Sequence, residues 1–248
     1  MTNMGRAFEF RKTRKLKRWS QMSKAFTRIG KDIVIAVKEG GADPQTNSKL
    51  RQVMQNAKTA NMPKENVLRA IKKASDKDTK NYEEITLEGY APHGIAIFID
   101  CATDNNNRTV ADVRSYFNKC NGSLGKNGSL EFIFERKGIF ILNSQKLEIS
   151  LDDLEMDLID YGLEDLHVDQ NEVFIYSAFS DFNIISSRLE TLNVEILKTE
   201  IRRIPKATKT ISLDQAKDVF KLLDLLEEND DVQQVAHDIT MTKEILTI

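Results

Sequence analysis

The most constraining feature of the sequence is an ordered succession of strand and helix patterns within residues 136–205. Ser150 can cap the first of two helical patterns and Gly162 can end it, because serine and glycine favour those positions. The predicted elements are strand 139–142, helix 151–161, strand 166–168, strand 173–176, helix 181–192 and strand 194–201. This order is that of the split βαβ, ferredoxin-like arrangement.

The segments on either side of this unit are each incomplete. Residues 82–135 predict strands at 85–90, 95–101 and 130–134, and one helix that Thr109 precedes as a cap. Residues 206–248 predict one helix, at 213–226, and one strand, at 232–239. Because a domain needs at least two packed layers around a core, we predict that 82–135 and 206–248 form one discontinuous α/β domain, into which 136–205 is inserted.

Residues 1–80 predict a separate helical bundle. Apolar side chains recur at helical spacing in three stretches, which are 26–37, 50–57 and 67–74. Gly40 and Gly41 stop the first helix, Asp43 and Pro44 begin the second, and Pro63 begins the third. The predicted fold class is therefore α+β, with an N-terminal three-helix domain plus two α/β (ferredoxin-like) domains, one inserted in the other.

Charge is divided unequally between these parts, although the whole chain has a formal net charge of only -2. Residues 1–80 hold 20 Lys and Arg against 7 Asp and Glu, a net of +13. Residues 81–248 hold 16 against 31, a net of -15. Such asymmetry indicates that the first part is a basic module for a polyanion and that the rest repels phosphate.

The basic side chains of residues 1–80 are the predicted nucleic-acid contacts. Six of the eight residues at 11–18, here called the basic arm, are Lys or Arg, so the arm is an exposed segment or a solvated helix. Phosphate contacts give affinity without reading sequence, and the flanking Phe8, Phe10 and Trp19 could stack on bases. A solvated tail and a transit peptide are the alternatives. The candidate residues are Arg6, Arg11, Lys12, Arg14, Lys15, Lys17, Arg18, Lys24, Arg28, Lys31, Lys49, Arg51, Lys58, Lys64, Lys72 and Lys73, with Arg69 on the same surface.

Two polar loops could in principle hold a ligand. Gly122, Gly125 and Gly128 have the spacing of a phosphate cradle, but a helix precedes them and a strand follows, so we interpret them as a turn. Residues 104–109 link a predicted strand to a predicted helix, where ligands often bind in α/β units. For that segment a binding loop and a plain polar loop stay equally open.

The sequence predicts no catalytic residue, no metal site and no cofactor. His93 and His167 have no Ser or Cys nucleophile beside them, and Cys101 and Cys120 form no closely spaced metal-binding pair. No apolar run is long enough to span a membrane, and no apolar stretch follows the N-terminal charges as in a signal peptide. We therefore expect a cytoplasmic, non-enzymatic protein.

The predicted inserted unit is strongly acidic. Residues 131–205 hold 7 basic and 16 acidic side chains, a net of -9. Its carboxylates are Asp152, Asp153, Glu155, Asp157, Asp160, Glu164 and Asp165. They predict either a solvated face or a docking surface for a basic protein.

Several strings spread along nearly the whole chain resemble the YebC/PmpR family, which is also the family of the mitochondrial translational activator of cytochrome oxidase subunit I. Many members begin with Gly-His-Ser-Lys-Trp, whereas this chain has Gly5-Arg6-Ala7-Phe8-Glu9-Phe10, so contacts of that His and Lys cannot be carried over. The matching strings are Gly40–Pro44, Asn61–Asn66, Asn81–Ile85, Glu88–Tyr90, Asp104–Arg114, Gly125–Ser129 and Arg136–Gly138.

The resemblance implies three domains, an N-terminal helical one and two α/β ones, and it implies no catalysis. It also implies nucleic-acid-binding regulation of gene expression, for which DNA-binding transcriptional regulators of the YebC/PmpR type are the leading expectation. The alternative is a ribosome- or RNA-binding translation factor. A duplex-DNA reader needs a recognition helix and commonly a dimer, whereas a ribosome binder needs a broad basic surface. The target and the oligomeric state are not predicted.

Overall fold

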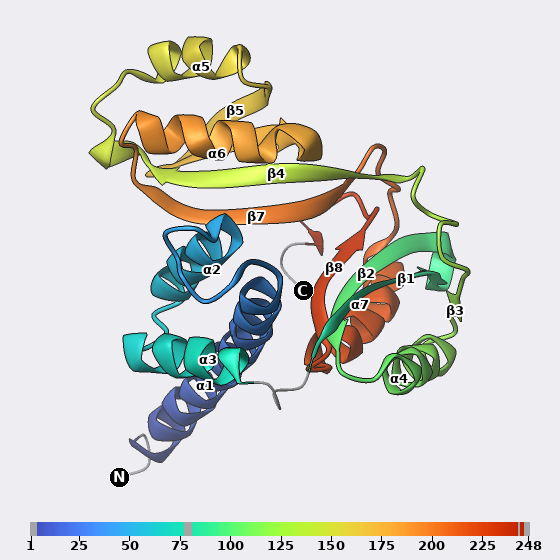
Figure 1. The fold of residues 1–248 in the computed structure, drawn as a ribbon. Helices are drawn as coiled ribbons and strands as arrows, with labels where there is room; N and C mark the ends of the chain where they lie inside the picture. The colour runs from blue at the N-terminus through green and yellow to red at the C-terminus, as the bar shows by residue number, and fades with distance from the viewer. Residues whose placement is uncertain (1–3, 77–80, 243, 246–248) are drawn as a thin grey trace. The chain divides into compact units, whose positions relative to one another are not determined.

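The computed structural model describes residues 4–76, 81–242, 244 and 245, with side chains from residue 22 onward. The chain divides into two compact units, Met1–Asn81 and Tyr82–Ile248. Figure 1 shows the helices and strands of these units. The fold is mixed α+β, as the sequence predicts, with seven α-helices and two four-stranded sheets in the described part of the chain.

The first unit consists of three helices. One long helix packs against two shorter ones, α1 (Met4–Gly40), α2 (Ser48–Thr59) and α3 (Lys64–Ser75). The backbone of the basic arm is helical and belongs to α1. The buried side chains of α2 and α3 are Leu50, Val53, Ala57, Val67, Ile71 and Ala74, which lie on the apolar faces that the spacing predicts.

The link between α1 and α2 corrects one predicted helix start. The helix begins at Ser48, not at Pro44, and Asn47 caps it by accepting a hydrogen bond from the Leu50 amide at 2.9 Å. The Asn47 amide group also donates to the carbonyl oxygens of Ala36 at 2.7 Å and Gly41 at 2.8 Å. An asparagine can accept and donate at once, whereas the carboxylate of Asp43 can only accept. Asp43 instead receives the Gln45 amide in a local turn at 2.9 Å.

The second unit begins with an antiparallel sheet of strand order β3-β1-β2-β8. Two helices cover one face of this sheet and share one apolar core with it. The strands are β1 (Glu83–Ala91), β2 (Ile95–Thr103), β3 (Ser123–Leu124) and β8 (Val232–His237). The helices are α4 (Asn106–Lys119) and α7 (Leu213–Glu228), and a short turn of 3₁₀ helix, η1 (Pro92–Gly94), joins β1 to β2.

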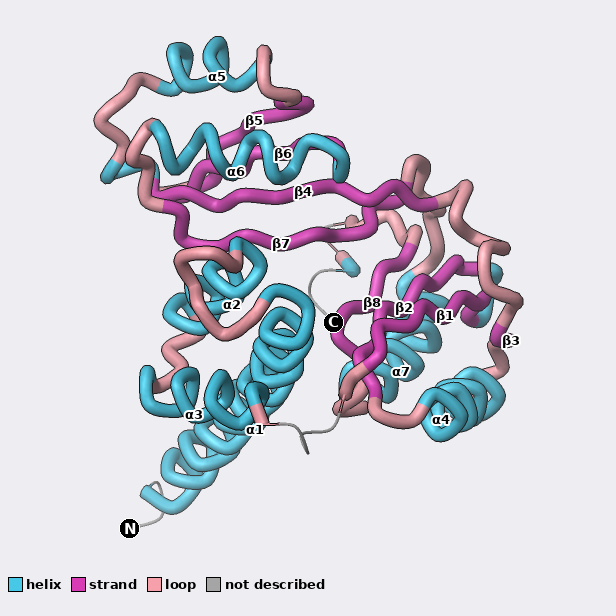
Figure 2. Tube along the Cα trace, viewed as in Figure 1, coloured by secondary structure: helices cyan, strands magenta, loops and turns pink. Residues whose placement is uncertain are grey.

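The second sheet of this unit has the order β5-β6-β4-β7, and both of its helices pack into one core on one face (Figure 2). The strands are β4 (Phe134–Asn143), β5 (Leu163–Asp169), β6 (Glu172–Ala178) and β7 (Ile196–Pro205). The helices are α5 (Leu151–Ile159) and α6 (Phe182–Thr191), with 3₁₀ turns η2 (Ser144–Lys146) and η3 (Phe179–Asp181). This succession confirms the ferredoxin-like pattern.

The strand predicted at residues 130–134 is wrong. Residues 130–133 form a turn, and β4 begins only at Phe134. Leu130 and Phe134 are apolar because they cover the face of the first sheet that α4 and α7 leave open. There the ring of Phe134 meets that of Phe98 edge to face, with 5.9 Å between centroids. Burial in a covering loop therefore produces the same apolar run as burial in a strand.

The two sheets meet where β4 begins and β7 ends. Phe134 pairs with Pro205 across these strands, so the chain enters and leaves the second sheet at neighbouring positions. Near this point the Arg203 guanidinium lies 3.7 Å above the centre of the Phe98 ring, and its Nε donates to Asp100 Oδ1 at 3.3 Å. The division of the second unit into a discontinuous domain and an inserted domain stays a prediction.

Candidate nucleic-acid interface

Four of the predicted contact lysines lie exposed on α2 and α3. Lys58 is in the last turn of α2 and Lys64 begins α3, on either side of the short connection between them. Lys72 and Lys73 are in the last turn of α3, where positive charge also suits the helix dipole. These four side chains, here called the α2–α3 lysines, face water on a folded surface, which phosphate contact requires. Arg69 is exposed on the same helix.

The other described candidates are less available. Lys31 is only 7% exposed, and Lys24 and Arg28 are half-buried. The Lys49 ammonium lies 3.0 Å from Glu39 Oε2. Arg51 donates from one guanidinium nitrogen to the carbonyl oxygens of residues 44 and 45, at 2.9 Å each, and so closes the loop before α2.

The remaining candidates lie outside the described side chains. They are Arg6, Arg11, Lys12, Arg14, Lys15, Lys17 and Arg18. The side chains of the flanking aromatic residues Phe8, Phe10 and Trp19 also lie outside the described part. Their backbone belongs to α1. Their contribution to binding therefore stays a prediction.

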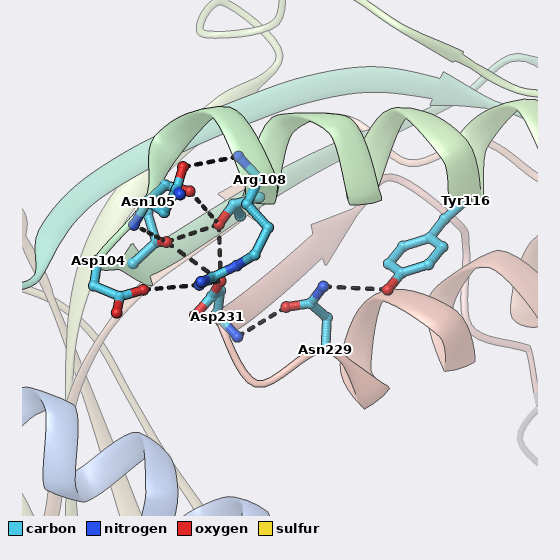
Figure 3. Close-up of polar contacts among 8 residues, drawn as sticks. Asp104, Asn105, Arg108, Tyr116, Asn229 and Asp231 are labelled. Atoms are coloured by element: carbon cyan, nitrogen blue, oxygen red, sulfur yellow. Dashed lines mark hydrogen bonds and ion pairs between the residues drawn. The ribbon is translucent and has the colours of Figure 1, made fainter.

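The polar segment 104–109 is engaged in an internal network, shown in Figure 3. Asp231, 6% exposed directly before β8, accepts from Arg108 Nη2 at 2.6 Å, and its Oδ2 lies 2.8 Å from the Thr109 hydroxyl. Arg108 also donates to Asp104 Oδ1 at 2.9 Å. The hydrogen bonds to Asp231 and then to Asp104 raise the pKa of Arg108, so the guanidinium stays charged. The contacts favour a structural role for the segment, which fastens β2, α4 and β8 together.

The same network corrects the predicted cap of α4. The helix begins at Asn106, and Asn105 caps it by accepting from the Arg108 amide at 3.1 Å. Thr109, expected in that role, is fully buried inside the helix and contacts Asp231. A buried hydroxyl facing a buried carboxylate completes the hydrogen bonding of both groups.

The glycine-rich stretch at 122–128 contains the short strand β3 and then a turn at residues 127 and 128, and a carboxylate of the protein itself binds backbone amides there. Glu88, 1% exposed on β1, accepts from the Gly128 amide at 2.8 Å and from the Leu130 amide at 2.6 Å. Gly128 has a φ of +83°, which glycine adopts without strain. The arrangement resembles an anion-binding nest, but the protein's own carboxylate fills it. A phosphate cradle is therefore excluded at this position.

His93 and His167, which the sequence analysis considered as catalytic candidates, each contact neighbouring side chains. His93 Nε2 lies 3.3 Å from Asp218 Oδ2 at the edge of a pocket of about 430 Å³, which Lys119, Cys120 and Lys221 also line. The His167 ring stacks on Phe174 and Tyr176, with centroid distances of 5.0 and 5.4 Å. No group of three or more His, Cys, Asp or Glu side chains suited to a metal ion occurs among the residues with described side chains.

The carboxylates of the acidic segment are mostly directed outward. Two of them are paired with basic side chains: Arg188 of α6 donates to both oxygens of Asp157, from Nε at 2.7 Å and from Nη2, and the Lys137 ammonium lies 2.5 Å from Glu164 Oε2. The hydrogen bonding from Arg188 lowers the pKa of Asp157. Asp152 and Glu155 lie exposed on α5 and Asp160 at its C-cap, and no described lysine or arginine forms an ion pair with them.

Sequence reasoning missed three of the residues that organise these sites, namely Asp231, Glu88 and Asn47. Asp231 lies 123 positions from Arg108, and Glu88 lies 42 positions from Leu130. No local pattern connects partners so far apart. Asn47 could have been found, since asparagine is among the best N-cap residues and Leu50 opens the apolar stripe.

Comparison with known proteins places both parts of the chain in one group. Residues 6–77 match the TACO1/YebC protein N-terminal domain, and residues 82–239 match the TACO1/YebC second and third domain. No helix in the described portion is long and apolar enough to cross a membrane.

Similar proteins match over almost their full length. A probable transcriptional regulatory protein of Flavobacterium psychrophilum is 57% identical, over 94% of this chain and 98% of its own. One of Wolinella succinogenes, with the same description, is 47% identical over 94% and 98%. The crystal structure of a conserved hypothetical protein from Aquifex aeolicus superimposes with a TM-score of 0.78 at 38% identity, covering 91% of this chain and 93% of that one.

Proposed function

The chain belongs to the TACO1/YebC family, and from that premise we propose that it regulates gene expression by binding nucleic acid through residues 1–80. The leading form of the proposal is a DNA-binding transcriptional regulator, because relatives from several bacteria carry the description probable transcriptional regulatory protein. That description is of a regulator and not of an enzyme, and the proposal includes no catalytic step. We also propose that the protein acts in the cytoplasm.

The observation that carries the proposal is the separation of charge. The net charge of +13 in residues 1–80 attracts phosphate, while the net charge of -15 in residues 81–248 repels it. The α2–α3 lysines extend the positive charge from the basic arm onto a folded surface. Contacts of this kind neutralise phosphates and release counterions, which gives sequence-independent affinity.

The binding test uses the full chain and two matched charge reversals. Replacing the α2–α3 lysines by glutamate should lower the affinity for DNA and RNA of any sequence. It should also reduce the slope of log K against log salt by roughly 0.7 to 0.9 for each lost contact. The control replaces Lys119, Lys126, Lys146 and Lys221 of the second unit by glutamate, which changes net charge equally. Equal loss in both variants would refute a localised interface.

A translation factor that binds RNA or the ribosome is the second candidate. The observation in its favour is that exposed basic side chains occur on both α2 and α3 and are not gathered on one recognition helix. Crosslinking in cells, followed by sequencing of bound DNA and RNA together, separates the candidates. Recovery of dispersed genomic DNA supports the first, and recovery of ribosomal RNA supports the second.

A further inference from the structure

The outer face of α5 combines exposed apolar side chains with uncompensated negative charge. Its inner face is buried, with Leu154 and Leu158 fully covered in the core of the second sheet. On the outer face Met156 is 72% exposed and Ile159 is 57% exposed. These two residues are three positions apart, so they are neighbours on one helix face. Large apolar side chains grouped on a surface mark an interaction site more often than single ones do.

The apolar pair lies within a ring of acidic side chains. Asp152, Glu155 and Asp160 are exposed and lie three or four positions from Met156 or Ile159 along the helix, on the same face. Residues 147–187 contain eleven acidic side chains and no lysine or arginine. The field at this face therefore repels a nucleic-acid backbone and attracts a basic group.

The helix that presents this face is fastened at its partly buried side. Arg188 of α6 hydrogen-bonds both oxygens of Asp157 and lies over the ring of Tyr161, 5.0 Å from its centre. The Ser150 hydroxyl caps the helix by accepting from the Asp153 amide at 3.1 Å. The outer face is thus held in place before any partner arrives, which lowers the entropy lost on binding.

We propose that the outer face of α5 is a docking site for a lysine- or arginine-rich amphipathic segment of another protein. Met156 and Ile159 would contact the apolar side of that segment, and Asp152, Glu155 and Asp160 would pair with its basic side chains. Unbranched methionine adapts to apolar surfaces of different shape, which suits such a role. This site is distinct from the nucleic-acid interface proposed for residues 1–80.

The test measures binding of the full chain to a synthetic peptide probe by calorimetry. The probe is a lysine–leucine peptide with leucines at helical spacing, and the comparison peptide has the same composition in scrambled order. We expect the ordered peptide to bind more tightly. Replacing Met156 and Ile159 by serine, which leaves charge unchanged, should weaken its binding about tenfold. The matched control is Ile184→Ser, which removes a 51% exposed apolar side chain from α6 and should change nothing.

A second variant tests the electrostatic part. Asp152→Asn with Glu155→Gln and Asp160→Asn should weaken binding and reduce its salt dependence. Circular dichroism of each variant verifies that the helix content is retained. Absence of binding by the unaltered chain would overturn the proposal. Equal binding of ordered and scrambled peptides, or unchanged binding by the serine variant, would do the same. A photo-crosslink from position 156 to labelled RNA would assign the face to nucleic acid instead.

Discussion

At the scale of single residues, two buried carboxylates fasten parts of the second unit that the sequence keeps far apart. Asp231 receives Arg108 at 2.6 Å and Thr109 at 2.8 Å, and Glu88 receives two backbone amides of the loop that precedes β4. A buried carboxylate without donors is costly, so each is retained only where several donors converge. Each carboxylate stabilises the fold by connecting elements that are far apart in the sequence.

Removing the Asp231 carboxylate should destabilise the second unit. Asp231→Ala leaves the buried Thr109 hydroxyl and the Arg108 guanidinium without their shared acceptor, and we expect a loss of about 2 to 3 kcal/mol in the free energy of unfolding. Urea denaturation at neutral pH measures this loss. Asp224→Ala, an exposed change on α7, is the control and should stay within about 0.5 kcal/mol. A similar small effect for Asp231→Ala would contradict the structural role assigned to the network.

The ion pair between Asp157 and Arg188 predicts a pH dependence. The pKa of Asp157 is lowered in the folded protein by its hydrogen bonds to Arg188. Its stabilisation is therefore present above the unfolded carboxyl pKa, and it is lost as the pH falls through the folded pKa. Because both side chains are about one-quarter exposed, 24% and 26%, we expect Asp157→Asn to cost only about 1 kcal/mol at pH 7.

Urea denaturation of the Asp157→Asn variant at pH 7 and in strong acid measures that dependence. The difference from the unaltered chain should shrink as acid protonates Asp157. A difference that is the same at both pH values would mean that the asparagine acts through packing and not through charge.

At the scale of elements, capping and turn residues decide where helices begin. A sequence pattern that is typical of a helix start can therefore predict the wrong first residue. Asp43 followed by Pro44 is typical of a helix start, yet α2 begins after Asn47. Asn47 caps the helix because it donates to the carbonyl oxygens of Ala36 and Gly41 and also accepts from the Leu50 amide in the first turn of the helix. Gly40 permits this, since a Cβ at that position would lie 2.7 Å from the Asn47 amide nitrogen.

The helix start therefore predicts unequal effects of two similar substitutions. Asn47→Ala removes the cap and two donated hydrogen bonds from a buried site, and we expect a loss of about 2 kcal/mol. Asp43→Ala removes only an exposed turn contact and should cost less than about 0.5 kcal/mol. Thermal and urea unfolding of both variants compare them directly. If Asp43→Ala proved the more damaging change, the helix start predicted by the sequence would be restored.

At the scale of the whole molecule, the second unit contains two sheets with separate apolar cores. Phe134 and Pro205 pair side by side where the chain enters and leaves the second sheet. An insertion with adjacent ends can be removed without separating the ends of its host. We therefore retain the proposal that 136–205 is inserted into a domain formed by 82–135 and 206–248.

Replacement of residues 136–205 by a short glycine-rich linker tests this proposal. The remaining chain should keep the sheet β3-β1-β2-β8 and unfold cooperatively, because α4 and α7 still cover that sheet. The readouts are circular dichroism and the sharpness of urea unfolding. Loss of cooperative unfolding would show that the second sheet is part of the same folding unit, with Arg203 and its contact to Phe98 as the first candidates for the cause.

The sequence by itself determined the features that depend on local periodicity and on charge. Local periodicity predicts the buried faces of α2 and α3 and the succession of elements in the ferredoxin-like part, because apolar side chains recur every few positions. Counting charged residues along the chain gives the separation of basic from acidic residues. Only the tertiary structure decided which polar side chains are used internally. Asp231, Glu88 and Asn47 acquire their partners through folding, at separations of 122, 42 and 11 positions. It also decided that residues 130–133 form a covering turn and that Met156 and Ile159 face outward, since burial depends on what packs against a segment and not on its composition.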